Sequence, residues 1–294
     1  MSEAAPQFAQ TFADAVARYF SPDMVCVVLG EVEIAAAFSS LPFDHLLYTG
    51  STAVGKKVMA AAAPNLTPVT LELGGKSPVV VLDDANLESV VNRVMMGKTL
   101  NAGQTCIAPD YVLIQRQHHD QFISLAKEWM EKHYPNIEHN PDYSRIINGD
   151  QFKRVKGYLD SLTGDEIYPL TTVEANIETR LMPPVIVREP ATDSDVMKNE
   201  IFAPILPLMH YETLDDAIRF VNARPRPLAL YVFGDHYNGL DNVRNHTVSG
   251  GLCINEVLIL VAQHDLPFGG VGDSGTGVYH GKAGFERLSH MKPV

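Results

Sequence analysis

The sequence is poor in cysteine and in basic side chains. Only 3 of its 294 residues are cysteines, Cys26, Cys106 and Cys253. An odd and widely spaced set suggests neither a disulfide framework nor a zinc site, so no metal is expected and a reducing cytoplasm fits best. With 23 Lys and Arg against 35 Asp and Glu, the net charge is -12. This balance argues against nucleic acid or an anionic membrane as partner and favours a small molecule.

Long apolar runs are also absent. No run reaches the length that spans a bilayer. The opening MSEAAPQFAQTFADAV is acidic and lacks the basic and then apolar pattern of a secretion signal. We therefore expect a soluble, cytoplasmic protein, and its 46% of hydrophobic residues are enough for a substantial core.

Helix-like and strand-like runs alternate along the whole chain, which is typical of an α/β fold. The alternation breaks at Gly74-Gly75, which favours two α/β domains meeting there. We expect helices over 6–19, 32–39, 53–63, 87–99, 119–132, 152–162, 214–222 and 239–245. We expect strands over 24–29, 45–48, 69–73, 77–82, 111–115, 184–187, 206–211, 229–233 and 251–255. Ligands of such folds gather at the carboxyl ends of strands.

The stretch TGSTAVGKK, at 49–57, runs from an expected strand into an expected helix. Gly50 allows close backbone approach, and Ser51 or Thr52 can cap the helix, whose free N–H groups attract phosphate. The stretch nearly matches the phosphate loop of nucleotide triphosphatases, but Lys57 stands where a hydroxyl must hold magnesium. A triphosphatase is therefore disfavoured, and the two remaining interpretations are a dinucleotide-binding turn and a simple capped turn.

The stretch LELGGKSP, at 71–78, places Glu72 at the end of an expected strand between leucines. Partial desolvation there would raise its pKa, which suits a general base working near neutral pH. A solvated glutamate at the end of a strand is the alternative. Cys106 follows one strand and one helix later, a path long enough to return to the same side of the sheet.

Cys106 lies in NAGQTCIAPDY, at 101–111, where its neighbours are small, polar or helix-breaking. Such a loop would turn the sulfur and its backbone N–H toward a cavity, where a thiolate could attack a carbonyl group. An inert loop cysteine remains the alternative. Cys26 and Cys253 look instead like buried strand residues.

These motifs carry a resemblance. LELGGKSP and NAGQTCIAPDY, in this order and at this separation, resemble the glutamate and cysteine signatures of the aldehyde dehydrogenase superfamily. TGSTAVGK is similar to its dinucleotide-binding turn, NEIFAP to its ribose-contacting Glu-x-Phe, and LPFGG to a segment of its substrate pocket. The ending GVYHGKAGFERLSH resembles the branch that oxidises fatty and aromatic aldehydes, with bacterial coniferyl-aldehyde dehydrogenases the most similar.

The resemblance implies a role for each matching residue. Cys106 would be the nucleophile, Glu72 the base that activates the deacylating water, and Phe268 part of the substrate pocket. It also implies NAD as cofactor, or NADP, a small aldehyde as substrate and a homodimer. The residues implied to bind the cofactor are Glu3, Gly30, Gly50, Ser51, Gly55, Leu73, Glu200 and Phe202.

The resemblance also implies a domain plan, with a partial, Rossmann-like dinucleotide-binding domain over 1–73, a catalytic domain over 74–268 and a C-terminal return segment over 269–294. The family's preceding strand, helix and Pro-Trp-Asn type motif are not found in the sequence, nor is its usual C-terminal tail. We therefore expect a truncated aldehyde dehydrogenase whose catalytic domain folds but which does not oxidise aldehydes unaided. Two alternatives are a pseudoenzyme fragment with a binding role and a cysteine esterase pairing Cys106 with His264.

Overall fold

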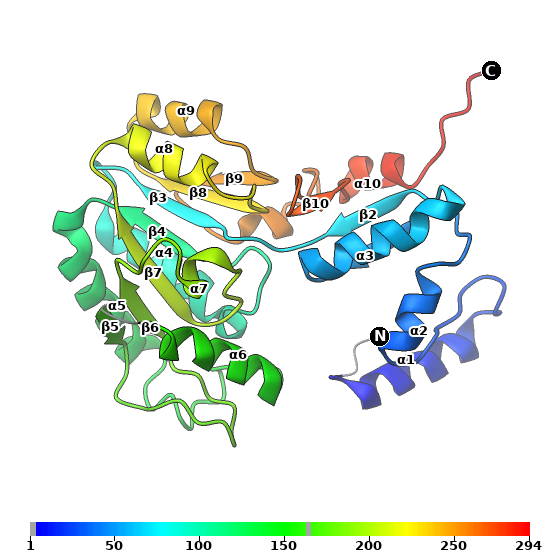
Figure 1. The fold of residues 1–294 in the computed structure, drawn as a ribbon, viewed down its shortest axis with the longest axis horizontal. Coiled ribbons are helices and arrows are strands. Elements are labelled where there is room, and N and C mark those ends of the chain that lie inside the picture. Colours follow the sequence, from blue (N-terminus) through cyan, green and yellow to red (C-terminus); the bar gives the residue numbers. More distant parts are fainter. Residues whose placement is uncertain (1–3, 163–165) are drawn as a thin grey trace. The chain divides into compact units, whose positions relative to one another are not determined.

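A computed structural model of the chain describes residues 4–162 and 166–294 (Figure 1). The chain divides into two compact units. The smaller unit comprises Met1–Tyr48 and Ala53–Val69, and the larger comprises Thr49–Thr52 and Thr70–Val294. Helices and strands alternate through most of the larger unit, which confirms the expected α/β class.

The larger unit is built on a seven-stranded sheet. Its strands are β3 (Pro78–Val81), β4 (Tyr111–Ile114), β5 (Glu166–Pro169), β6 (Val185–Arg188), β7 (Ile205–His210), β8 (Ala229–Phe233) and β9 (Gly251–Ile254). Their spatial order is β5-β6-β7-β4-β3-β8-β9, and only β5 runs antiparallel to its neighbour. The central strands β3 and β4 are continuous apolar runs with every residue buried, as expected for parallel strands covered on both faces.

Helices cover both faces of this sheet. The larger unit contains α4 (Leu87–Thr99), α5 (His119–His133), α6 (Gly149–Asp160), α7 (Asp195–Lys198), α8 (Leu214–Asn222), α9 (Tyr237–His246) and α10 (Gly281–Arg287), of which α10 lies beside β2 and β10 and not on this sheet (Figure 1). The connection through α4 leads from β3 to β4, whereas the connection through α8 leads from β7 back to β8. Because parallel crossovers are right-handed, α4 and α8 lie on opposite faces, with α5 beside α4 and α9 beside α8 (Figure 1).

Polar residues determine where several of these helices begin. The Asn86 side chain accepts a hydrogen bond from the Ser89 N–H at 2.9 Å and so caps α4. At the start of α8, the Thr213 hydroxyl accepts from the Asp216 N–H, while the Thr213 N–H donates to the Asp216 carboxylate. Each cap satisfies a backbone group that the helix leaves free and is worth about 1 kcal/mol.

A second, three-stranded sheet has the order β1-β2-β10, with β1 (Leu46–Thr49), β2 (Val69–Glu72) and β10 (Gly275–Thr276). Strand β10 runs antiparallel to β2 and places Gly275 opposite Glu72. The Leu73 N–H donates to the Ser274 carbonyl at 3.2 Å and extends this pairing. The C-terminal part of the chain is therefore bound along the strand that ends at Glu72.

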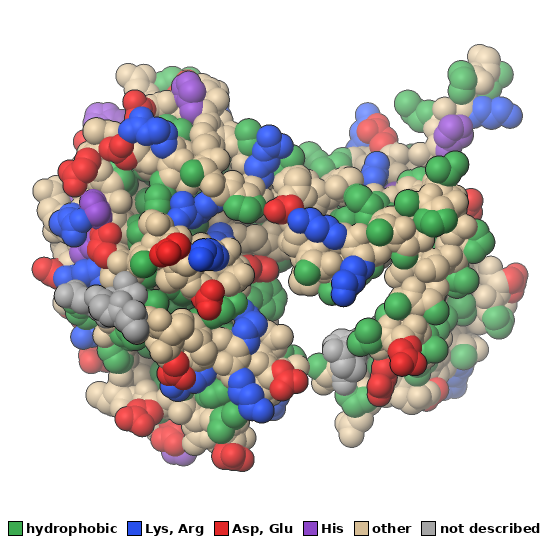
Figure 2. Space-filling view, viewed as in Figure 1, with side chains coloured by type: hydrophobic (Ala, Val, Ile, Leu, Met, Phe, Trp, Pro, Cys, Tyr) green, Lys and Arg blue, Asp and Glu red, His purple; other side chains and the backbone are tan. Residues whose placement is uncertain are grey.

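The smaller unit contains α1 (Pro6–Tyr19), α2 (Val32–Phe38) and most of α3 (Thr52–Ala62). Its segments are joined by backbone contacts, such as the hydrogen bond from the Leu46 N–H to the Pro68 carbonyl at 2.9 Å. Many of its apolar side chains face solvent (Figure 2). Among them, Met24 is 72% and Val32 79% exposed.

The strand expected at 24–29 is wrong. This segment is irregular, and none of the described strands pairs with it. An apolar run such as VCVVL forms a strand only where a sheet edge offers hydrogen-bond partners, which the local sequence does not specify. Cys26 is consequently exposed and not buried, whereas Cys253 is buried in β9 as expected. The remaining expected elements are confirmed within a few residues, and β5, α7, β10 and α10 were not anticipated.

Candidate active site

Cys106 follows a tightly turned loop between α4 and β4. Three successive residues before it, Asn101, Ala102 and Gly103, have left-handed φ values of 52°, 54° and 74°. A Cβ at Gly103 would lie 2.7 Å from the Ala203 carbonyl oxygen, so only glycine fits there without a shift. The backbone turn that presents the thiol therefore depends on the small residues of the motif.

Gln104 holds this loop in place. Its Nε2 donates to the Asn101 carbonyl at 2.9 Å and to the Arg145 carbonyl at 3.0 Å. Its Oε1 accepts from the Ile147 N–H at 2.9 Å. The Gln104 side chain thus connects the loop by hydrogen bonds to the segment that precedes α6. These bonds hold the backbone beside Cys106 in position.

The Cys106 thiol is half-buried and electrostatically perturbed. Burial raises the pKa of Cys106 to about 11, and the charges of Glu200 and Glu72 act in the same direction. Hydrogen bonds from the backbone N–H groups of Cys106 and Ile107 oppose this rise by stabilising the thiolate. A thiol with this pKa is mostly protonated at neutral pH, so a nearby proton acceptor has to act before it can attack.

Glu72 is a buried carboxyl group with no partner of its own. It is 4% exposed, and neither carboxylate oxygen has a hydrogen-bond partner among the described residues. Burial raises the pKa of Glu72 to about 7. Strand β10 pairs with this strand end and places Gly275 opposite Glu72. A desolvated carboxyl group that titrates near pH 7 has the properties of a general base.

Glu200 is a second carboxyl group with a raised pKa. Burial raises the pKa of Glu200 to about 7, the charge of Asp110 adds to the rise, and a hydrogen bond from the Gly75 N–H opposes it. A Cβ at Gly74 would lie 2.0 Å from the Glu200 Oε1. Gly74 therefore leaves the space that the Glu200 carboxyl group occupies, and the Gly75 N–H donates a hydrogen bond to it.

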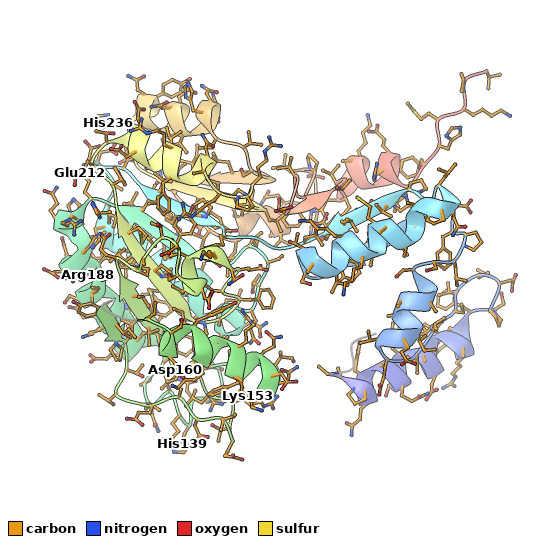
Figure 3. The ribbon with its side chains drawn as sticks, in the orientation of Figure 1. His139, Lys153, Asp160, Arg188, Glu212 and His236 are labelled. Atoms are coloured by element: carbon orange, nitrogen blue, oxygen red, sulfur yellow. The ribbon has the colours of Figure 1, made fainter. Side chains whose placement is uncertain are left out.

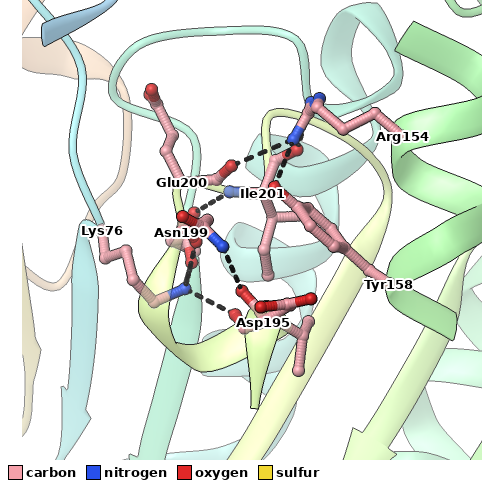
Figure 4. A network of polar contacts seen from close by, with 9 residues as sticks. Lys76, Arg154, Tyr158, Asp195, Asn199, Glu200 and Ile201 are labelled. Carbon is pink, nitrogen blue, oxygen red and sulfur yellow. Dashed lines mark hydrogen bonds and ion pairs between the residues drawn. The ribbon is translucent and has the colours of Figure 1, made fainter. Parts of the chain in front are cut away.

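An ion-pair network fixes the segment that carries Glu200 (Figure 4). Lys76 forms an ion pair with Asp110 and donates to the Asn199 carbonyl at 3.0 Å. The other Asp110 oxygen accepts from the Ile201 N–H at 2.9 Å. Only the backbone of Glu200 takes part, and its side chain extends away from the network (Figure 4).

The other expected cofactor residues lie in different surroundings. The Gly50 N–H donates to the Glu72 carbonyl at 3.0 Å, so this turn adjoins the candidate base, and Ser51 beside it is exposed. Leu73 is buried at 4% exposure. Phe202 is 38% exposed, with a left-handed φ of 49° that is uncommon for an aromatic residue.

Two expected residues are not brought to this site by any described contact. Gly55 is buried within α3. A Cβ at Gly30 would meet the side chain of Ile34 at 2.5 Å, which is a packing requirement inside the smaller unit. Glu3 lies outside the residues that the structure describes.

Three aromatic rings lie together near the end of the chain, and one of them, Tyr279, is within electrostatic reach of Glu72 and Cys106. Phe268 and Tyr279 exchange two backbone hydrogen bonds, at 2.9 and 2.8 Å, and the ring of His280 stacks on Phe268 at 5.4 Å. Burial raises the pKa of Tyr279, and the charges of Glu72 and Cys106 add to the rise. Tyr279 and His280 were missed as site residues, although both stand in the ending that carries the resemblance.

The arrangement does not support a cysteine–histidine dyad. Burial and the charges of Glu200 and Glu72 raise the pKa of the Cys106 thiol, and no described hydrogen bond or ion pair joins this thiol to a histidine. His264 is exposed, and its ring lies 5.5 Å from that of His280. No described contact therefore supports the pairing of Cys106 with His264 that the esterase alternative requires.

The described parts of the chain show no group of three or more His, Cys, Asp or Glu side chains arranged to hold a metal ion. Within the same residues, no helix combines the length and the apolar character that crossing a membrane requires.

Fold and site together are typical of an α/β enzyme that uses a cysteine thiol beside carboxyl groups. The chain belongs to the aldehyde dehydrogenase family, whose model matches residues 1–294. It is 50% identical over 296 residues to a probable coniferyl aldehyde dehydrogenase of Pseudomonas aeruginosa, covering 100% of this chain and 62% of that protein. It is 44% identical to aldehyde dehydrogenase family 3 member A2 of Rattus norvegicus, covering 99% of this chain and 60% of that protein.

Solved structures show the same likeness. The substrate-bound state of Staphylococcus aureus AldH matches with a TM-score of 0.93 and 40% identity, covering 98% of this chain and 63% of that one. The Mycobacterium tuberculosis aldehyde dehydrogenase complexed with NAD+ matches with a TM-score of 0.78 and 27% identity, covering 88% and 54%. The chain thus spans about three fifths of the length of the curated relatives it matches.

Proposed function

We propose that the whole protein oxidises an aldehyde to the carboxylic acid, with NAD as the hydride acceptor and Cys106 as the nucleophile. One observation carries this proposal. A half-buried thiol lies within electrostatic reach of two carboxyl groups whose pKa values are both about 7. Such carboxyl groups exchange protons readily at neutral pH, as a thiol with a pKa of about 11 requires.

In the first step, the Cys106 proton passes to a carboxylate and the sulfur adds to the aldehyde carbon. The oxygen of the aldehyde then carries negative charge. The backbone N–H groups of Cys106 and Ile107, which hydrogen-bond the sulfur, are close enough to stabilise this developing oxyanion. This role rests on a loop that Gln104 and Gly103 hold in one conformation.

After the hydride has left the carbon for the acceptor, an acyl group remains on Cys106, and Glu72 then takes a proton from water as the water attacks this acyl group and the Cys106 thiolate leaves. The unpartnered Glu72 oxygens can accept that proton, because no described side chain competes for them. Ionised Glu72 is unfavourable in its buried position, which strengthens it as a base. We assign it deacylation for this reason.

Glu200 and Phe202 fit the ribose and the nicotinamide of the cofactor. The Glu200 side chain lines a pocket of about 540 Å³ that Gly75 and Thr52 also line. Gly74 leaves room for the carboxylate that would bond the ribose hydroxyls. The cofactor supplies the acceptor for the aldehyde hydride when it is bound.

The substrate and the domain plan are parts of the same proposal. An aromatic aldehyde such as coniferyl aldehyde is favoured because several similar curated proteins carry that name. Residues 1–73 would serve the cofactor, 74–268 the chemistry, and 269–294 would return to β2, as the pairing of β10 illustrates. A homodimer is expected from the resemblance. The free state of the three cysteines fits a cytoplasmic setting.

The test follows NADH absorbance after the full-length protein that contains this chain is mixed with NAD and coniferyl aldehyde, with NADP in parallel, because the chain by itself is not expected to oxidise aldehydes. We expect formation of NADH that Cys106→Ser abolishes and Cys253→Ser preserves, because the latter thiol is buried in β9. Equal rates in wild type and Cys106→Ser would refute the proposed nucleophile. Light scattering during chromatography measures the dimer.

A further inference from the structure

Most of the charged side chains that line the pocket of Glu200 are basic. Lys198, Arg224 and Arg226 all line it, together with Lys76. Lys76 is neutralised by its ion pair with Asp110. The other three cations form no ion pair with a carboxylate of the described chain.

Arg224 is the most informative of these cations. It is half-buried, its guanidinium lies 3.5 Å from the centre of the Phe220 ring, and its Nη1 donates to the Phe220 carbonyl at 3.1 Å. Its Nε is buried and has no hydrogen-bond partner among the described residues. Burial lowers the pKa of Arg224, because a desolvated cation without a counter-ion is unfavourable. A bound anion would remove that cost.

Lys198 and Arg226 are the exposed basic residues of the pocket. Both side chains are exposed and make no hydrogen bond or ion pair with the described chain. The carboxyl groups that face the pocket are those of Glu200 and Asp273, and Glu200 is bound to the Gly75 N–H. With Lys76 neutralised by Asp110, three cations and two carboxyl groups line the pocket, so the part lined by Lys198, Arg224 and Arg226 attracts anions.

We propose that Lys198, Arg224 and Arg226 form a binding site for the phosphate group of an anionic ligand. Two guanidinium groups and an ammonium group match the several oxygens of a phosphate, since arginine can donate two parallel hydrogen bonds to it. A pocket of about 540 Å³ holds more than a lone phosphate ion. The ligand is either the pyrophosphate of the dinucleotide, which rests on the proposed function, or a separate phosphorylated molecule, which does not.

The test measures the dissociation constant of inorganic pyrophosphate for the full chain by calorimetry. Variants are Lys198→Gln, Arg226→Gln and the double variant, since exposed side chains can be changed without loss of packing. Lys153→Gln is the matched control, because Lys153 of α6 is an exposed lysine that does not line the pocket (Figure 3). Arg224→Met follows once Trp129 fluorescence shows that it folds.

We expect pyrophosphate to bind at least about tenfold more weakly to the double variant and unchanged to Lys153→Gln. Added sodium chloride should weaken binding to the wild type. A parallel loss of NADH affinity in the double variant identifies the dinucleotide as the ligand, and unchanged NADH affinity identifies a separate phosphorylated molecule.

Two results would count against a proposal, one against the phosphate site and one against the cofactor. Equal pyrophosphate affinity in wild type and double variant overturns the phosphate site. Pyrophosphate binding without any NADH binding leaves the phosphate site standing and counts against the proposed cofactor, so the two proposals fail separately.

Discussion

Replacing Glu72 by glutamine should stabilise the larger unit, and more at alkaline than at acid pH. The Glu72 carboxyl group is buried, and its oxygens have no partner among the described residues. Glutamine keeps the shape and removes the charge. The variant therefore isolates the free energy that the folded protein loses when Glu72 ionises in place.

The magnitude follows from the pKa. The folded value of about 7 lies about 2.5 above the ordinary 4.5, so the folded protein holds this proton more tightly than the unfolded chain does. Stability from Glu72 is complete below pH 4.5 and is lost as the pH rises toward 7. At about 1.4 kcal/mol per pKa unit, glutamine should be favoured by about 3 kcal/mol at pH 8 and by less than about 1 kcal/mol at pH 5.

Urea unfolding, followed by the fluorescence of the single tryptophan, Trp129 in α5, measures this difference in the unit that holds Glu72. Glu131→Gln is the control. Glu131 lies on α5, as Trp129 does, is exposed, and makes no hydrogen bond or ion pair with the described chain. A stability difference between Glu72→Gln and wild type that stays constant from pH 5 to pH 8 would refute the reasoning.

Two further predictions concern the support of Glu200. Gly74→Ala places a Cβ 2.0 Å from the Glu200 Oε1, so the carboxylate must move and NADH affinity should fall about tenfold or more. In the control Gly157→Ala, the new Cβ meets no atom within 4 Å, so NADH affinity should stay unchanged. Fluorescence titration with NADH compares the two variants. Asp110→Asn removes the partner of the buried Lys76 and should cost about 3 to 5 kcal/mol in urea unfolding, and an unchanged midpoint would contradict a structural role for the pair.

Local patterns were sufficient to predict much of the fold. The apolar runs of β3 and β4 are strands because both faces are buried, and the spacing between them leaves room for one helix. The segment 24–29 shows the limit, since its apolar run has no neighbouring strand among those described. Pairing depends on distant residues, and the same is true of β10, whose two residues gain their structure from β2.

For the candidate site, the sequence indicated Glu72 and Cys106 because each lies in a short motif that contains glycine and a helix-breaking proline. It did not indicate the ion pair of Lys76 with Asp110, whose members are 34 residues apart and meet only in the folded chain. Tyr279 was missed for the same reason, since its position near Glu72 follows from the return of the C-terminal segment. Burial, and therefore the raised pKa values, became visible only with the packing.

The most direct test of Cys106 as the acyl-carrying nucleophile and Glu72 as its deacylating base uses an activated ester and needs no cofactor. The chain and its Glu72→Gln variant are incubated with p-nitrophenyl acetate, and the acetylated residue is identified by intact mass and peptide mapping. We expect the acetyl group to accumulate on Cys106 in Glu72→Gln and to be released faster from the wild type. An acetyl group on another residue, or equal rates of release, would contradict the proposed roles.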